Sequence, residues 1–300
     1  MQNIQKEILC KNQDYDYAII LDDEEDEDKG EKQNSSEEKK PHSEIKIKKS
    51  RKIITPVFLK TGFFEEEEIM EIGVDEAGRG PLFGRVYTAA VVLPKNSHLF
   101  DHTLMKDSKK FHSKKKIQEV AEYIKENAVA WSVTYEDEKS IDEINILQAT
   151  QKSMHHSISN ILNNNHIQEN NNNHNLFNYK AKMLSRCGFI PKSIHLLIDG
   201  NYFNTFSYYN KKIKKIEIVP HVCIEGGDNQ YSAIAAASIL AKVERDAYID
   251  ELCEKYPELA EKYGIDTNKG YGAKKHLDGI KQHGITQWHR KTFGICKSFV

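Results

Sequence analysis

Long apolar runs are absent from this sequence of 300 residues. The longest nearly apolar stretch extends from Tyr231 to Ala241, far short of the roughly 20 residues that a membrane-spanning helix requires. The first 20 residues also lack an apolar core followed by small residues, which is the pattern of a secretory signal. The sequence therefore predicts a cytoplasmic protein that has no membrane partner.

Cysteine is scarce, and the motifs of several enzyme classes are missing. The five cysteines are scattered, and no two of them form a CxxC pair. This distribution argues against a disulfide framework and against a thiolate zinc site, and it indicates a reducing compartment. The chain contains neither the HExxH pattern of zinc hydrolases nor the GxSxG pattern of serine hydrolases.

The near-neutral net charge of −2 hides an uneven distribution. Residues 1–68 carry 12 basic and 18 acidic residues, whereas residues 69–300 carry 31 basic and 27 acidic residues. The second part of the chain is therefore basic overall, although the acidic first part masks this in the whole-chain average. The net charge of the whole chain therefore does not exclude a nucleic-acid partner.

Two low-complexity segments flank or interrupt the part of the chain that has a globular composition. Residues 22–28 read DDEEDED and residues 46–52 read KIKKSRK, so we expect a disordered charged tail over residues 1–66. Nine of the sixteen residues at 163–178 are Asn, which predicts a surface insertion at about 163–180. The rest of the sequence predicts a folded domain over residues 67–254 and a helical segment over residues 255–300.

Hydrophobic patterning predicts an α/β fold. Strand-like segments occur at 71–76, 86–93, 128–135, 194–198 and 215–219, and helical segments occur at 142–162 and 231–252. The second helix begins with alanines and serines, which allow another backbone to approach closely. Strands that first form hairpins and later alternate with helices indicate a mixed central sheet flanked by helices. The polar segment after residue 255 predicts a small C-terminal helical cap.

Acidic residues stand where three of these elements end or begin. Asp75 and Glu76 end the first strand, Asp199 directly follows the strand at 194–198, and Asp228 precedes the helix at 231–252. Each of them alone is compatible with a turn or a solvent-facing cap. If the three elements meet at one edge of the sheet, the four carboxylates together suit two hard divalent cations.

The glycine-rich segment after Glu76 does not fit a dinucleotide-binding loop. Gly78, Gly80 and Gly84 have the spacing GxGxxxG, Pro81 follows the second glycine, and the next element is a strand. A glycine-flanked arginine can instead bring backbone amides and a guanidinium close to a sugar–phosphate backbone.

Basic residues also recur near the acids in sequence, notably at 106–110, 114–116, 242–245 and 269–276. A charge run by itself is more commonly a solvated face. Beside a set of acids, however, the basic residues indicate an enzyme that acts on a polyanion.

Six blocks of sequence carry a recognisable family pattern. They are GVDEAGRGPLFG at 73–84, KDSKKF at 106–111, IDEINILQAT at 141–150, LIDGN at 197–201, GGD…SAIAAASILAKVERD at 226–246 and KGYGAKKH…HGITQWHRKTFG at 269–294. In this order the blocks resemble type 2 ribonuclease H, and within it bacterial ribonuclease HII. The resemblance covers about residues 69–300 and implies a ribonuclease H-like fold. Phe83 and His112, the tail and the Asn-rich segment depart from the family pattern.

This resemblance implies a monomeric endonuclease that hydrolyses the RNA strand of RNA–DNA hybrids. It also implies cutting 5′ of a single ribonucleotide embedded in duplex DNA, with 5′-phosphate and 3′-hydroxyl products. By motif match, two Mg²⁺ or Mn²⁺ ions would be held by Asp75, Glu76, Asp199 and Asp228. One ion would activate the attacking water, and the other would stabilise the leaving 3′ oxygen.

The resemblance also implies a set of substrate contacts. Gly78, Arg79 and Gly80 would read the 2′-hydroxyl, and Tyr271 would pack on the deoxyribose that follows. Lys109 and Lys242 would hold phosphates, whereas Asp246 is better interpreted as a supporting charged residue of the helix.

Two alternatives stay open at this stage. Another two-metal nuclease of the same superfamily would share the acids but would have no use for the Gly-Arg-Gly turn together with Tyr271. A non-catalytic nucleic-acid-binding protein would gain nothing from four acids, because they weaken binding to a phosphate backbone.

Overall fold

The computed structural model describes residues 58–96, 98–162, 193–210 and 214–300. All of them belong to one compact unit, which spans Thr55–Val300. Residues 1–57 of the expected tail and the expected insertion at 163–180 lie outside the described residues.

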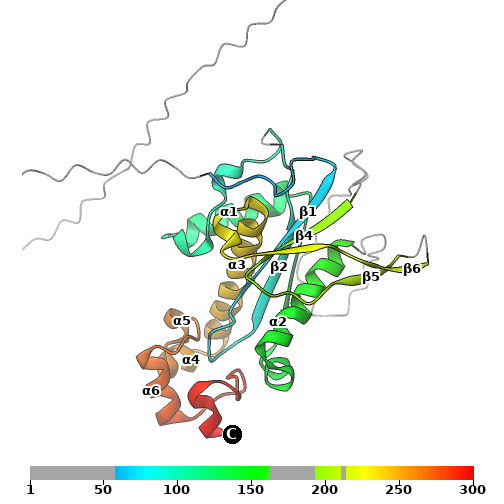
Figure 1. Ribbon diagram of the computed structural model, residues 1–300. Helices are drawn as coiled ribbons and strands as arrows, with labels where there is room; N and C mark the ends of the chain where they lie inside the picture. Colours follow the sequence, from blue (N-terminus) through cyan, green and yellow to red (C-terminus); the bar gives the residue numbers. More distant parts are fainter. Residues whose placement is uncertain (1–57, 97, 163–192, 211–213) are drawn as a thin grey trace, which may run out of the picture. The chain divides into compact units, whose positions relative to one another are not determined.

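A five-stranded mixed sheet forms the centre of the domain (Figure 1). Its strand order is β3-β2-β1-β4-β7, with β1 at Ile69–Ala77, β2 at Val86–Val92, β3 at Ala130–Glu136, β4 at Ser193–Asp199 and β7 at His221–Ile224. The strands β1, β2 and β3 pair antiparallel, whereas β4 is parallel to both β1 and β7. The carboxyl ends of β1, β4 and β7 therefore meet at the same edge of the sheet.

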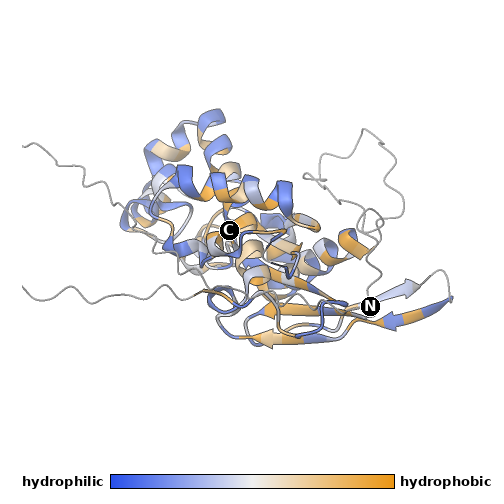
Figure 2. Ribbon diagram, turned by 90° about the horizontal axis from the view of Figure 1, so that it is seen from above, coloured by the Kyte–Doolittle hydropathy of each residue, from blue (hydrophilic) through white to orange (hydrophobic). Residues whose placement is uncertain are grey.

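Helices cover both faces of this sheet (Figure 1). The helices α1 (Lys114–Asn127) and α3 (Ser232–Lys255) pack on one face, and α2 (Glu138–Leu162) packs on the other. Because side chains alternate along a strand, each of the two faces contributes to its own hydrophobic core. Figure 2 shows the apolar residues gathered between sheet and helices, with hydrophilic residues along the outer sides of the helices.

The small residues at the start of α3 allow close packing on β1, as the sequence predicts. A Cβ atom added to Gly73 would lie 2.3 Å from the backbone carbon of Ala233, a distance that real atoms do not tolerate. Gly73 and the buried alanines of α3 therefore bring the helix against the strand that carries Asp75.

Most of the expected elements are confirmed, and one is placed differently. The segment 215–219 does form a strand, β6 (Lys215–Ile218), but it pairs with β5 (Ser207–Asn210) in a separate two-stranded ribbon. The fifth strand of the main sheet is instead β7, which lies immediately after that ribbon in sequence. The expected α/β class with a mixed sheet is confirmed.

The C-terminal segment is helical and continues from the end of α3 (Figure 1). It comprises α4 (Glu258–Tyr263), α5 (Ile265–Asn268), α6 (Lys274–His283) and a 3₁₀ turn at Gly294–Phe299. Within the described residues, no helix is both long and apolar enough to cross a membrane.

Residues 58–66 belong to the folded domain, although the sequence analysis assigns them to the tail. The amide of Lys60 donates to Gln230 O at 2.8 Å, and the carbonyl of Lys60 accepts from Ser232 N at 2.9 Å. The amides of Phe63 and Phe64 each donate to the buried carboxylate of Glu71 at 2.9 Å. The expected tail boundary at residue 66 is therefore too late. The acidic composition of 65–68 suggested solvation, but contacts with distant residues hold the segment in place.

Candidate active site

The four acids singled out in the sequence lie at the edge where the parallel strands end. Asp75 and Glu76 are near the end of β1, and Asp199 is the last residue of β4. Asp228 lies in a short 3₁₀ turn, η4 (Gly227–Asn229), between β7 and α3. This edge of a mixed α/β sheet is where such folds commonly bind their ligands.

Asp75 is the most enclosed member of the set. Its side chain is 5% exposed, and its Oδ1 accepts a hydrogen bond of 2.6 Å from the amide of Glu76. Burial raises the pKa of Asp75 well above its usual value, and the charges of Glu76 and Asp199 raise it further. A hydrogen bond from Ser238 of α3 opposes this shift. Asp75 thus lies close enough to Glu76 and Asp199 for their negative charges to shift its pKa.

Glu76 also lies near Asp199, but it has two cations beside it. Burial raises its pKa, and the charge of Asp199 adds to this, whereas Arg79 and Lys109 lower it. The guanidinium of Arg79 lies 3.2 Å from Glu76 Oε1. Asp199 in turn accepts a hydrogen bond of 2.7 Å from the amide of Gly227.

Asp228 is buried beside a further acid that the sequence analysis did not single out. Burial raises the pKa of Asp228, followed by the charges of Asp107 and Asp199, while Lys109 and Asn229 lower it. Asn229 donates to Asp228 Oδ1 at 3.0 Å and accepts from Lys110. The carboxylate of Asp228 is therefore oriented by its sequence neighbour.

Asp107 has a local role that its sequence context could have suggested. Its carboxylate accepts from the amide of Lys109 at 2.9 Å and so caps the 3₁₀ turn η2 (Ser108–Lys110). An Asp immediately before such a turn is a typical capping signal. Through this cap, Asp107 fixes Lys109 at the acids. Ser108 in the same turn shares a hydrogen bond of 3.0 Å with Ser238.

A cleft of about 480 Å³ opens at these acids. Nine of the ten residues that the sequence analysis selects line it, namely Asp75, Glu76, Gly78, Arg79, Gly80, Lys109, Asp199, Lys242 and Tyr271. Asp228 is not part of the lining and adjoins the cleft through its neighbour Asp199. The fold thus brings together residues that are separated by up to about two hundred positions in sequence.

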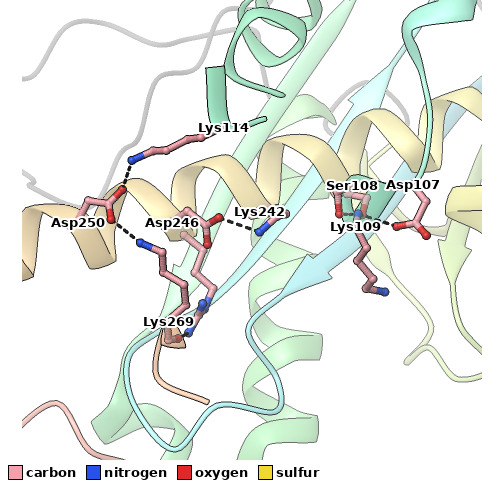
Figure 3. A network of polar contacts seen from close by, with 10 residues as sticks. Asp107, Ser108, Lys109, Lys114, Lys242, Asp246, Asp250 and Lys269 are labelled. Carbon is pink, nitrogen blue, oxygen red and sulfur yellow. Dashed lines mark hydrogen bonds and ion pairs between the residues drawn. The ribbon is translucent and has the colours of Figure 1, made fainter. Parts of the chain in front are cut away.

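A row of charged pairs lies along α3 (Figure 3), and its members Lys242, Asp246 and Lys269 line the cleft. Lys242 lies 2.7 Å from Asp246, and Asp250 lies 2.5 Å from both Lys114 and Lys269. Burial alone would raise the pKa of Asp250, but the two lysines outweigh it and lower the pKa. Asp246 pairs with a lysine of its own helix, which fits its interpretation as a supporting residue.

The chemistry of the donor set fits hard divalent cations. All four side chains offer oxygen atoms. For Asp75, Glu76 and Asp228, burial and the charges of neighbouring carboxylates raise the pKa, so their charged forms are costly without a cation nearby. In the part of the chain that the structure describes, no three of them are yet grouped as a ready-made metal cage. Two of the carboxylates are directed to main-chain amides instead, Asp75 to Glu76 N and Asp199 to Gly227 N.

Comparison with known proteins decides the family. Residues 72–296 match the family described as Ribonuclease HII. The chain belongs to the ribonuclease HII family. Ribonuclease HII of Bacteroides thetaiotaomicron is 38% identical over 229 residues, which are 76% of this chain and 92% of that relative. Ribonuclease HII of Neisseria meningitidis is 36% identical over 232 residues, which are 77% of this chain and 96% of that relative.

Solved structures share the fold of this ribonuclease HII family member. The ribonuclease H2 of Pyrococcus horikoshii matches with a TM-score of 0.52 and 21% identity, over 77% of this chain and 96% of the other. The ribonuclease HII in a PCNA complex from Archaeoglobus fulgidus matches with a TM-score of 0.50 and 22% identity, over 75% and 96%. The expected ribonuclease H-like fold is confirmed.

Membership of the ribonuclease HII family also settles the general activity. The chain is an enzyme, a type 2 ribonuclease H, and it is therefore a hydrolase and an endonuclease. The expected family and enzyme class are confirmed. The cleft at the strand ends is the candidate for its active site.

Proposed function

We propose that this enzyme hydrolyses the RNA strand of RNA–DNA hybrids and cuts 5′ of a single ribonucleotide embedded in duplex DNA. The products are a 5′-phosphate and a 3′-hydroxyl. The observation that carries the proposal is the meeting of Asp75, Glu76 and Asp199 with the Gly78–Gly80 turn and Tyr271 in one cleft. Acids alone would serve many nucleases, whereas this turn and this tyrosine give the cleft a means to read sugars.

Two divalent ions, Mg²⁺ or Mn²⁺, fit the acids of this cleft. Asp75, Glu76, Asp199 and Asp228 would hold them, because the four offer only oxygen donors and repel one another when no cation is near. When bound, the ions supply positive charge for the attacking water and for the leaving 3′ oxygen. The protein contributes the rigid strand ends and the hydrogen bonds from Ser238 and Asn229 that orient two of the carboxylates.

The turn after β1 is shaped so that its backbone can approach a sugar. Gly78 has a φ of 94°, and a Cβ atom at this position would lie 2.2 Å from Arg245 Nε. A Cβ atom at Gly80 would face the ring of Tyr271 at 3.5 Å. Gly80 and the half-exposed Tyr271 are therefore neighbours across the rim of the cleft. This arrangement supports recognition of a ribose by the turn and of the next deoxyribose by the tyrosine.

Cations next to the acids are placed for the phosphates. Lys109 lines the cleft, and its charge lowers the pKa of both Glu76 and Asp228, so it lies near both acids. Lys242 lines the same cleft one helical turn before Asp246. Both ammonium groups can contact the phosphates on either side of the scissile bond, which would position the strand without reading its sequence.

Cleavage of matched duplexes tests the proposal. The purified full chain is incubated with an all-DNA duplex, the same duplex with one ribonucleotide, and an RNA–DNA hybrid, each with Mg²⁺, Mn²⁺, Ca²⁺ or EDTA. We expect a single cut 5′ of the ribonucleotide and several cuts in the hybrid RNA, both with Mg²⁺ or Mn²⁺ and neither with EDTA. Equal cutting of the all-DNA duplex would refute the proposal and favour a general two-metal nuclease.

A further inference from the structure

The C-terminal segment sends two adjacent side chains, His289 and Arg290, into the interior behind the cleft. They are 1% and 0% exposed. Neither has a place in the mechanism described above, and burying an arginine is costly unless its donors are satisfied. The question is what these two residues hold.

Arg290 holds the turn that follows β1. Its Nη2 donates to Gly78 O at 2.6 Å, and its Nη1 donates to Arg79 O at 3.0 Å and to Pro81 O at 2.8 Å. Its Nε donates to Gly84 O at 2.8 Å. One guanidinium thus binds four carbonyl oxygens of a single loop, from partners 206 to 212 positions away in sequence.

This arrangement makes use of the geometry of arginine. The guanidinium presents five donors in a fixed plane, whereas the ammonium of lysine presents three donors from a single point. Four carbonyl groups can be satisfied by the five donors of arginine but not by the three donors of lysine. The guanidinium therefore ties four carbonyl groups of residues 78–84 to one point.

His289 is linked to the backbone of Tyr271, on the opposite side of the cleft rim from Gly80, through a second histidine, His276. Its Nδ1 accepts from the amide of Thr286 at 2.9 Å, so the proton of the neutral ring lies on Nε2. That Nε2 lies 3.1 Å from His276 Nε2, which must then accept. The remaining ring nitrogen of His276, Nδ1, donates to Tyr271 O at 2.8 Å. The chain of hydrogen bonds has one direction and ends on the backbone of Tyr271.

The two held loops also contact each other. The amide of Leu82 donates to Gly270 O at 2.9 Å, and Leu82 O accepts from the amide of Arg290 at 2.9 Å. A Cβ atom added to Gly270 would lie 2.9 Å from Phe83 O, so the loops approach as closely as a glycine allows. The turn at 78–84, the Tyr271 loop and the C-terminal segment therefore form one connected unit.

We propose that His289 and Arg290 form a clasp that fixes the distance between the Gly78–Gly80 turn and Tyr271. They are positioning residues, because they act through the backbone of the two loops. The inference rests on the proposed function, in which these loops contact two successive sugars. The clasp sets the spacing that lets a ribose and the following deoxyribose be engaged at the same time.

The first experiment replaces Arg290 by lysine, which keeps the charge and most of the volume. With a duplex that contains one ribonucleotide, we expect kcat/KM to fall by about 100-fold, because a shift of roughly 1 Å at such a site has this effect. The affinity for an all-DNA duplex, measured by fluorescence anisotropy in Ca²⁺, should stay within about twofold, because the basic cleft is intact.

The matched control is Ile158→Ala. Ile158 is fully buried on the other face of the sheet, in the core under α2, and has no contact with the clasp. This variant should lose thermal stability and keep kcat/KM within about twofold. If Arg290→Lys loses no more than twofold, or if Ile158→Ala loses as much activity as Arg290→Lys, the clasp is refuted.

A double-mutant cycle tests the link from His289 through His276 to Tyr271. His276→Ala should lower kcat/KM in the wild-type background, whereas in a Tyr271→Ala background it should lower kcat/KM by less than about twofold further. Equal losses in both backgrounds would show that His276 does not act through Tyr271.

Hydrogen exchange separates the clasp from the proposed function. In Arg290→Lys without substrate, the amides of residues 79–84 should exchange faster, while those of β2 are unchanged. If the wild-type enzyme leaves duplexes with one ribonucleotide uncut, the proposed function fails, whatever the variants do. If the exchange of residues 79–84 is unchanged in Arg290→Lys, the clasp fails, whatever the substrate is.

Discussion

At the scale of single residues, the position of an acid within its strand decides which other carboxylates it lies close to. Asp75 stands on the face of β1 that meets α3, and its carboxylate feels both Glu76 and Asp199. The repulsion among these groups would be a pure cost in a structural protein. In a metal-dependent hydrolase it keeps several charged oxygens ready for a cation.

Asp75→Asn is expected to abolish cleavage and to preserve binding. The loss of this proposed metal ligand should reduce kcat by roughly 10³-fold or more, since each 1.4 kcal/mol of lost stabilisation costs a factor of ten. The dissociation constant for a hybrid, measured without cleavage in Ca²⁺, should stay the same or fall, because one negative charge near the phosphates is removed. Asp278→Asn, which changes an exposed carboxylate paired with Lys274, is the control and should cleave normally. Full activity of Asp75→Asn would show that this side chain binds no metal.

Two glycines of one turn are expected to fail in different ways. Gly78→Ala should destabilise the fold, because φ is 94° and the new Cβ would lie 2.2 Å from Arg245 Nε. Gly80→Ala meets only the ring of Tyr271 at 3.5 Å, so the variant should fold normally. Its methyl group would nevertheless occupy the space where, in the proposed function, a sugar approaches the backbone.

Melting temperature and cleavage of a duplex with one ribonucleotide separate these two effects. Gly80→Ala should melt within about 2 °C of wild type and lose roughly tenfold or more in kcat/KM. Gly78→Ala should melt at a clearly lower temperature. A fully active Gly80→Ala enzyme would contradict the placement of the sugar at this turn.

The acids and the glycine turn could be predicted from sequence, because each stands beside a local signal. An acid at the end of an apolar strand and a glycine-flanked arginine are visible without any structure. Arg290 is different, since its four acceptors lie more than two hundred positions away. A basic residue near the C-terminus looks like a solvated charge until the fold shows that it is buried.

At the scale of elements, local sequence pattern predicts that a strand or helix forms better than it predicts which element it pairs with. The segment 215–219 has the pattern of a strand and is one, yet only the fold shows that it pairs with β5 and not in the main sheet. The helix α1 is missing from the elements expected from sequence, because the three lysines at its start are typical of a basic patch. Its apolar residues Ile117, Val120 and Ile124 are buried at helical spacing, which was the available signal.

The helix α2 carries a break that its sequence pattern does not reveal. Asn145 has a φ of 66° and interrupts the helical backbone, and its side chain accepts from the amide of Gln148 at 3.1 Å. The asparagine thus caps the second half of the helix. An Asn within an apolar periodic run is easily taken for an ordinary polar position, because the sequence alone does not show which backbone conformation it adopts.

The buried histidine pair that links the C-terminal segment to Tyr271 should make stability depend on pH. Burial, and then the charge of His276, lower the pKa of His289 to about 3, against 6.5 in an unfolded chain. Between these values the unfolded state binds a proton that the folded state does not. The free energy of unfolding therefore falls as the pH drops below about 6.5, with a slope that approaches 1.4 kcal/mol per pH unit.

Urea denaturation from pH 7 to pH 5 measures this dependence. His289→Gln has no group to titrate at this position, so its curve against pH should be flatter than that of wild type. The difference between the two curves isolates His289 from the carboxylates, which titrate in both proteins. Parallel curves would show that His289 is protonated as readily in the folded enzyme as in the unfolded chain.

At the scale of the whole molecule, the first described residues of the domain are bonded to the sheet edge that carries the candidate active site. Residues 58–66 lie beside the start of α3, where Lys60 bridges to Tyr231, three residues after Asp228. The same segment covers Glu71, which is paired with Lys95 at 2.7 Å. The acidic sequence at 65–68 does not predict these contacts, because the hydrogen-bonding partners of residues 58–66 come from distant parts of the chain.

Two truncations should therefore behave differently. Removal of residues 1–57 should leave thermal stability and cleavage unchanged, since the composition of that segment predicts a solvated charged tail. Removal of residues 1–66 takes away four hydrogen bonds that the backbone of Lys60, Phe63 and Phe64 makes to Gln230, Ser232 and Glu71, and it leaves Glu71 with fewer donors. At about 1 kcal/mol for each bond, the free energy of unfolding should fall by roughly 4 kcal/mol. Cleavage should then fail at a lower temperature, because the start of α3 beside Asp228 is loosened. Equal melting temperatures for the two truncated proteins would show that residues 58–66 contribute nothing to the fold.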